Sequence, residues 1–148
     1  MSYAGDLTPQ EAWAKLEAGA LLVDVRTEGE WAQIGIPVTA AATEKRQDPL
    51  FVQWSLAGGV PNPLFLEELQ RQLQQQLRQQ APDAGSTDLV FLCRSGARSI
   101  AAANAATAAG FTAYNVLEGF EGEPGPSGAR TVNGWKNRGL PTNQDRAQ

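Results

Sequence analysis

The chain has 148 residues, 42% hydrophobic and 19% charged, which is the composition of an ordinary globular protein with room for one buried core. Its formal net charge of −4 provides no overall basic field and argues against nucleic acid or an anionic membrane as a partner. One cysteine excludes an intramolecular disulfide, and the lack of histidine leaves no ligand set for zinc, so no metal is expected.

No apolar run approaches the roughly 20 residues of a membrane span, and the first six residues lack the apolar core of a signal peptide. A lone free thiol suits a reducing compartment, so we expect a cytoplasmic protein. The pattern predicts one domain over residues 1–148, with a mobile tail from about 141 to 148.

Helical periodicity or strong helix propensity marks several segments. The first begins with a capping box, in which Thr8 and Glu11 satisfy each other's backbone amides and Pro9 occupies the first turn. The predicted helices are residues 8–19, 62–81 and 99–109, with a short terminal helix around Trp135.

Short apolar runs between these helices are typical of strands covered on both faces of a sheet. They are residues 20–25, 88–92 and 113–117, with a shorter strand expected within 36–42. We interpret residues 26–31 as a polar turn and 118–130 as a loop that decorates the surface. The alternative for 118–130 is a loop that covers a pocket or contacts a partner. Strands that alternate with helices favour an α/β fold with a mostly parallel sheet.

The one cysteine follows the strand at 88–92, and a short loop with Gly96 then leads into an alanine-rich helix. Ligands of open α/β sheets bind at the carboxyl ends of strands, where loop amides and a helix N-terminus attract anions. Arg94 and Arg98 add two positive charges, and Ser99 is expected to cap the helix. These features favour Cys93 as a thiolate.

A thiolate attacks sulfane sulfur, and the same amides and guanidiniums would hold an anionic donor and then a persulfide. Sulfur transfer between thiolates needs no general acid, so a chain without histidine can perform it. Asp24 and Arg26 end the strand beside this loop, and an ion pair of Arg26 with Glu28 or Glu30 is expected to pin the turn.

Four motifs in this order resemble the rhodanese family. The first motif is Leu22–Trp31 with Ile36–Pro37, the second is Cys93–Ser99, the third is Phe111 with Asn115–Gly119, and the fourth is Gly134–Trp135 with Gly139–Pro141. The resemblance implies a rhodanese-like α/β fold, a central mostly parallel sheet with helices on both faces, and thiosulfate sulfurtransferase-like activity through a Cys93 persulfide.

The resemblance also implies roles for individual residues. Cys93 would be catalytic, and the substrate-binding residues would be Arg94, Ser95, Gly96, Ala97, Arg98 and Ser99. From their place at the end of a buried strand and in the turn after it, rather than from the resemblance, we expect Asp24, Arg26 and Glu30 to give structural support. No cofactor is expected. The partners would be a small anionic sulfur donor such as thiosulfate or a polysulfide and a thiol or cyanide acceptor. A protein that carries a persulfide is a further candidate partner.

Two other functions stay open on the sequence alone. One alternative is a non-enzymatic module that carries or senses sulfur by docking a protein. The other is a phosphatase or arsenate reductase of the same fold. Those oxyanion enzymes resemble it but have a loop one residue longer between cysteine and arginine. Only four residues separate Cys93 from Arg98, and Leu92 stands where such enzymes often have histidine. A smaller cradle suits sulfur better than phosphate.

Overall fold

The centre of the computed structural model is a five-stranded sheet; the structure describes residues 3–39, 48–78, 87–94, 96–130 and 132–143. The strands are β1 Gly5–Leu7, β2 Leu21–Asp24, β4 Leu50–Phe51, β5 Leu89–Leu92 and β6 Ala113–Val116. They lie in the order β1-β6-β5-β2-β4, and every neighbouring pair is parallel. The expected α/β class with a mostly parallel sheet is confirmed.

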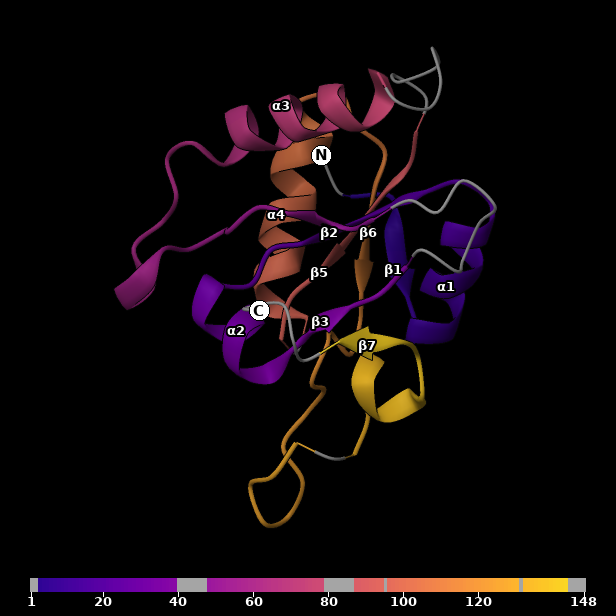
Figure 1. The fold of residues 1–148 in the computed structure, drawn as a ribbon, viewed down its shortest axis with the longest axis vertical. Coiled ribbons are helices and arrows are strands. Elements are labelled where there is room, and N and C mark those ends of the chain that lie inside the picture. Colours follow the sequence, from indigo (N-terminus) through magenta and orange to yellow (C-terminus); the bar gives the residue numbers. More distant parts are fainter. Residues whose placement is uncertain (1–2, 40–47, 79–86, 95, 131, 144–148) are drawn as a thin grey trace.

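Helices cover both faces of this sheet (Figure 1). They are α1 Pro9–Glu17, α2 Glu28–Ile34, α3 Phe65–Arg78 and α4 Ala97–Ala108, with two 3-10 turns, η1 Ala57–Gly59 and η3 Trp135–Arg138. Side chains of α3 and α4 share one core cluster with the strands, and those of α1 and η3 share another on the opposite face. The strands β2 and β5 are buried throughout because both of their faces are covered.

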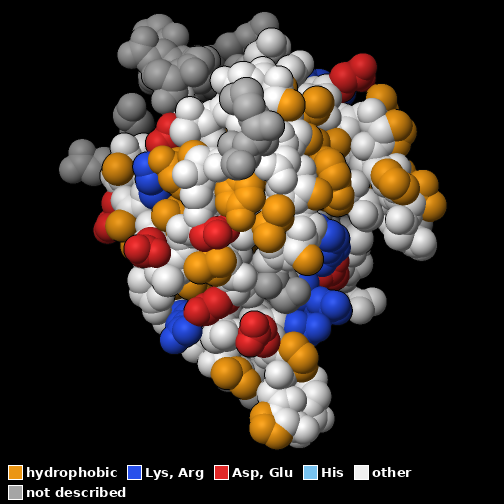
Figure 2. Space-filling view, turned by 180° about the vertical axis from the view of Figure 1, so that it is seen from behind, with side chains coloured by type: hydrophobic (Ala, Val, Ile, Leu, Met, Phe, Trp, Pro, Cys, Tyr) orange, Lys and Arg blue, Asp and Glu red, His pale blue; other side chains and the backbone are white. Residues whose placement is uncertain are grey.

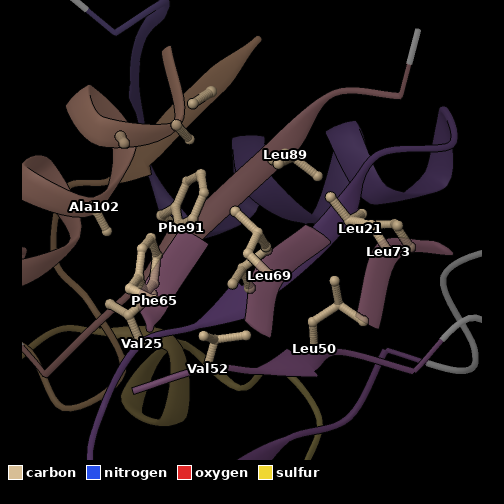
Figure 3. Packing of buried hydrophobic residues seen from close by; sticks show 14 of the residues in the cluster. Leu21, Val25, Leu50, Val52, Phe65, Leu69, Leu73, Leu89, Phe91 and Ala102 are labelled. Atoms are coloured by element: carbon tan, nitrogen blue, oxygen red, sulfur yellow. The ribbon is translucent and has the colours of Figure 1, made fainter. Parts of the chain in front are cut away.

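The larger core cluster follows from the leucine spacing of α3. Phe65, Leu69 and Leu73 lie on one face of the helix and pack against the sheet at Leu21 and Phe91 (Figure 3). Burial of each such side chain stabilises the fold by roughly 1.5–3 kcal/mol. This packing fixes β5, and with it the position at which the chain leaves the sheet toward Cys93.

The segment at 26–31 was expected to be a turn, and that expectation is wrong. Residues Glu28–Ile34 form α2, which begins with a capping box between Thr27 and Glu30 and ends before Gly35 at φ 110°. The first helix has the same device at Thr8 and Glu11, as predicted. A helix therefore follows β2 directly and brings Glu30 toward the carboxyl end of the sheet.

A second, two-stranded sheet lies beside the main one. It pairs β3 Ile36–Pro37 with β7 Thr142–Asn143 in antiparallel fashion. A strand was expected within 36–42, and residues 40–42 of that range lie outside the described residues. Residues 144–148 of the expected mobile tail also lie outside them. Among the described helices, none has the length and apolar character that crossing a membrane requires.

Candidate active site

Cys93 is the first residue after β5, at the carboxyl end of the sheet. Its Sγ atom accepts a hydrogen bond from the Gly96 amide at 3.1 Å. The residue is only 1% exposed, and it lines a cavity of about 370 Å³. The other residues that line this cavity are Glu30, Arg94, Ala97 and Arg98. The sulfur therefore lies at the base of an opening walled by charged side chains.

The loop between Cys93 and α4 turns on Gly96. This glycine has φ 108° and stands at the N-cap of α4 without a side-chain cap. A Cβ atom here would collide with the Leu117 carbonyl oxygen, so the turn requires glycine both for its backbone conformation and for this close approach. The turn directs the Gly96 amide back at the sulfur.

The start of the loop after β6 holds the backbone of the cysteine loop in place. The Phe120 amide donates to the Cys93 carbonyl at 2.7 Å, and the Glu121 and Gly122 amides donate to the Arg94 carbonyl at 2.9 and 3.2 Å. Phe120 and Glu121 are buried. The expectation that 118–130 merely decorates the surface is therefore wrong for its first five residues, which support the cysteine.

This support continues to η3. Trp135 and Lys136 donate backbone hydrogen bonds to the carbonyls of Gly119 and Phe120 at 2.8 and 3.0 Å. Glu118 accepts from Arg138 at 2.6 and 2.9 Å. The guanidinium outweighs the effect of burial and lowers the pKa of Glu118. The terminal turn thus fixes the loop that fixes Cys93.

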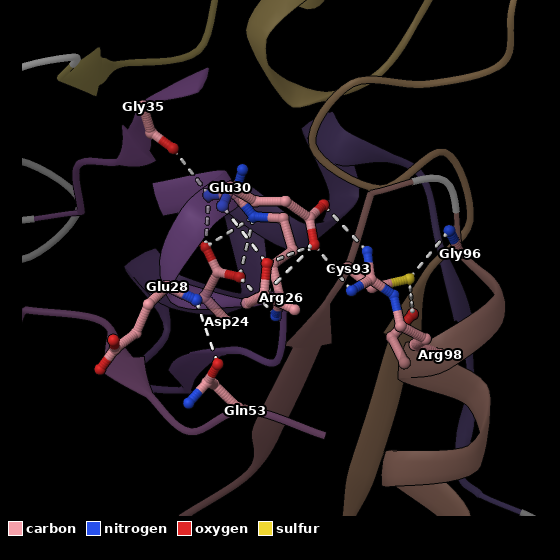
Figure 4. A network of polar contacts seen from close by, with 11 residues as sticks. Asp24, Arg26, Glu28, Glu30, Gly35, Gln53, Cys93, Gly96 and Arg98 are labelled. Carbon is pink, nitrogen blue, oxygen red and sulfur yellow. Dashed lines mark hydrogen bonds and ion pairs between the residues drawn. The ribbon is translucent and has the colours of Figure 1, made fainter. Parts of the chain in front are cut away.

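Arg98 projects from the first turn of α4 and forms a bidentate ion pair with Glu30 of α2, at 2.7 and 3.0 Å. Burial alone would raise the pKa of Glu30, but Arg98 and the Thr27 amide and hydroxyl outweigh it, so this pKa lies below its ordinary value. The hydrogen bond to Glu30 raises the pKa of Arg98, and the negative charges of the Glu30 and Asp24 carboxylates add to this effect. Figure 4 shows Glu30, Arg98 and Cys93 together, while the Glu28 side chain points away.

Arg26 has a different partner from the one the sequence suggested. Its guanidinium binds Asp24, with the shortest contact 2.7 Å from Nη2 to Oδ2, and donates to the Gly35 carbonyl at 2.8 Å. It also lies 4.0 Å from the ring centre of Phe120. The predicted pair with Glu28 or Glu30 is wrong. Through these contacts the Asp24–Arg26 pair joins β2, the end of α2 and the loop after β6. Asp24 and Arg26 are both 0% exposed, so this junction lies inside the protein.

Ser99 does not cap α4, contrary to expectation. It is the third residue of the helix, fully buried, with its Oγ atom 3.2 Å from the Cys93 sulfur. The hydroxyl donates to Oδ1 of Asn115 at 2.5 Å, and Nδ2 of Asn115 donates to Asp6 at 3.1 Å. Four side chains from the cysteine loop, α4, β6 and β1 therefore form one connected series.

The remaining residues with an expected binding role differ in exposure. Arg94 and Ala97 are exposed and line the cavity, whereas Ser95 lies outside the described residues. A larger hollow of about 580 Å³ adjoins the cavity and shares Arg98 with it. The view from behind shows acidic and basic side chains interspersed rather than one field of a single sign (Figure 2).

Sequence reasoning missed two groups of residues at this site. Asp6 carries no motif, and its contact with Asn115 appears only when β1 pairs with β6. Asn115 was noticed only as part of a family motif. It did carry a physical signal, since a buried strand that contains an amide side chain must supply that amide with partners. Glu121 and Phe120 were hidden within a stretch interpreted as surface loop.

The protein is an α/β protein whose candidate active site is a buried cysteine at the carboxyl end of a parallel sheet. A glycine turn and a helix N-terminus lie directly after this cysteine. The chain belongs to the rhodanese-like domain family, whose model matches residues 8–122. It is 34% identical over 123 residues to the uncharacterized protein RP600 homolog of Rickettsia rickettsii, covering 82% of this chain and 81% of that protein. A Rickettsia conorii protein, RC0915, is 33% identical over the same length.

Two solved structures are similar to this chain in fold. The crystal structure of Rv0390 from M. tuberculosis is similar with a TM-score of 0.80 and 42% identity, covering 97% of this chain and 99% of that one. A rhodanese-like domain protein from Staphylococcus aureus is similar in fold, with a TM-score of 0.52 and 19% identity over 93% of this chain and 96% of that one.

Proposed function

We propose that the protein moves sulfane sulfur from an anionic donor to a thiophilic acceptor through a persulfide on Cys93. The observation that carries the proposal is the placement of the sulfur. It lies 3.1 Å from the Gly96 amide, at the base of a cavity that also contains Arg94 and Arg98. Two guanidiniums against the one carboxylate of Glu30 favour an anion beside the sulfur.

The reaction takes place in two steps. The Cys93 thiolate attacks the outer sulfur of the donor, the S–S bond of the donor breaks, and its electron pair leaves with the remainder, which is sulfite when the donor is thiosulfate. The acceptor thiolate or cyanide then attacks the outer sulfur of the persulfide, and the Cys93 thiolate leaves. The donor is oxidant for the cysteine and the acceptor reverses that oxidation, so no further redox partner is required.

The donor and acceptor classes follow from the charge and size of the opening. A cavity of about 370 Å³ accommodates thiosulfate or a short polysulfide, and cyanide or a small thiol as acceptor. The adjoining hollow, which is lined by residues that include Gln53, Leu56 and Gly59 and reaches Arg98, favours a protein persulfide as a second candidate partner. A reducing compartment such as the cytoplasm suits this chemistry, because the thiol must stay free.

The experiment compares sulfur transfer from thiosulfate to cyanide by the wild-type chain and by Cys93→Ser. The expected result is a rate reduced to the uncatalysed background in the variant, with the circular dichroism spectrum unchanged. An unchanged rate removes the proposal. A sulfur carrier for a protein acceptor would instead take up sulfur on Cys93 but show little turnover with cyanide. That outcome would identify the protein as a sulfur carrier and refute its role as an enzyme that uses cyanide.

A further inference from the structure

The hydrogen bonds behind Cys93 have a fixed direction. Asp6 Oδ1 accepts from the Tyr3 hydroxyl at 2.8 Å and from Nδ2 of Asn115 at 3.1 Å. An ionised carboxylate only accepts, so it must face the amino side of the Asn115 amide. The carbonyl oxygen of the same amide consequently faces Ser99. The exposed edge strand β1 thus determines how a buried amide is oriented.

This orientation determines what Ser99 offers to the sulfur. A serine hydroxyl has one proton, and Ser99 donates it to Oδ1 of Asn115 at 2.5 Å. The Oγ atom, 3.2 Å from the Cys93 sulfur, therefore presents a lone pair to it. A thiol can donate to that lone pair, whereas a thiolate gains nothing from it. Ser99 in this arrangement favours the protonated sulfur and opposes the effect of the Gly96 amide.

The opposite arrangement requires a change at Asn115. If the Ser99 proton turned toward a thiolate, Oδ1 of Asn115 would lose its donor. Asn115 and Ser99 are 1% and 0% exposed, so water would not readily replace that hydrogen bond. A buried carbonyl without a donor is unfavourable. Rotation of the amide would restore a donor to Ser99 but would place the carbonyl oxygen against the Asp6 carboxylate.

We propose that Asp6 and Asn115 are positioning residues that hold the Ser99 hydroxyl proton away from Cys93 and thereby shift its thiol–thiolate balance toward the thiol. The consequence for turnover rests on the proposed function, because only a sulfur-transfer reaction makes this balance a control on rate. The ionisation itself is a property of the folded chain and is measured without any donor.

Other charged groups lie around the cysteine loop and remain in place when Asp6 is changed. They are Asp24 and Arg26 at the end of β2, Glu30 on α2, Arg94 in the cysteine loop, Arg98 on α4 and Glu121 after β6. Tyr3 precedes β1 and contacts Asp6 rather than the sulfur. Among the charged side chains of the described residues, Asp6 is the one that accepts a hydrogen bond from Asn115.

The test measures the pH midpoint of thiolate formation from ultraviolet absorbance, with Cys93→Ser as baseline, since the chain has one cysteine. Asp6→Asn removes the acceptor-only partner and lets the Asn115 amide rotate, so that Nδ2 donates to Ser99 and Ser99 donates to the sulfur. Asp6 is exposed on an edge strand, so this variant is expected to fold. The midpoint should move about one pH unit lower.

Two controls separate this mechanism from the simple loss of a negative charge. In the Ser99→Ala background no hydroxyl connects Asn115 to the sulfur. Asp6→Asn should then move the pH midpoint of thiolate formation by no more than about a few tenths of a pH unit. Glu17→Gln, which also removes an exposed carboxylate, should leave it in place. No shift in Asp6→Asn, or the same shift with and without Ser99, would overturn the proposal. Sulfur transfer by the wild type is assayed separately.

Discussion

The ion pair between Glu30 and Arg98 links two segments 68 residues apart and closes one side of the cavity. Replacement of Glu30 by glutamine keeps the side-chain shape and one acceptor oxygen, so the helix cap with Thr27 can persist. It removes the charge and one of the two hydrogen bonds from Arg98. Hydrogen bonds to charged groups contribute about 1.5–3 kcal/mol, and partial solvent screening reduces this, so we expect a loss of about 1–2 kcal/mol.

The loss should depend on pH in a defined direction. Because the pKa of Glu30 is lower in the folded protein than in the unfolded chain, its contribution is complete above the ordinary glutamate pKa of about 4.3. It disappears as the pH falls through the depressed folded value. Urea unfolding of wild type and Glu30→Gln should therefore differ at neutral pH, and the difference should shrink as the pH falls below the ordinary glutamate pKa and through the depressed folded pKa.

Glu28→Gln is the matched control for this experiment. Glu28 occupies the same first turn of α2, is exposed, and points away from the cysteine loop in Figure 4. Its removal should affect only the small interaction with the helix terminus. Equal losses in the two variants, or a Glu30→Gln deficit that persists in acid, would refute the account of the pair.

Two further substitutions test the parts that hold the site. Asp24→Asn leaves the fully buried Arg26 guanidinium without its counter-charge, so denaturant unfolding should show a loss of about 3–5 kcal/mol; a loss below about 1 kcal/mol would contradict the pairing. Gly119→Ala puts a Cβ atom 2.5 Å from the Arg94 carbonyl, at φ 67°, and should destabilise the protein by about 2 kcal/mol or more. Gly128→Ala, also at positive φ but in open space, is its control and should cost only about 1 kcal/mol.

The sequence predicted the elements that depend on local patterns. The continuous apolar runs at β2, β5 and β6 and the leucine spacing of α3 each reflect burial that a single segment reveals by itself. The strand-to-cysteine junction followed from the same logic. The strands β1 and β4 escaped notice because three-residue and two-residue segments are too short for a hydrophobic period.

The missed helix α2 and the ion-pair partners have different causes. Thr27 and Glu30 form the same capping signature as Thr8 and Glu11, but the seven-residue helix that follows contains Gly29 and little apolar period, so the segment resembled a turn. Glu30 pairs with Arg98 and not with Arg26, because α2 approaches the start of α4 in the folded protein. The Arg98–Glu30 contact joins distant segments and is set by tertiary packing, so it leaves no local trace. The Asp24–Arg26 pair is local, two residues apart, and was missed because the carboxylates after Arg26 were preferred to the one before it.

The most direct test of the persulfide is intact-protein mass spectrometry after exposure to thiosulfate and removal of excess donor. The proposed chemistry predicts the mass of one added sulfur atom, localised to the peptide that contains Cys93, and its loss after treatment with cyanide. The Cys93→Ser chain should gain no sulfur. A wild-type mass that does not change, or an added sulfur that cyanide leaves in place, would contradict sulfur transfer through this thiol.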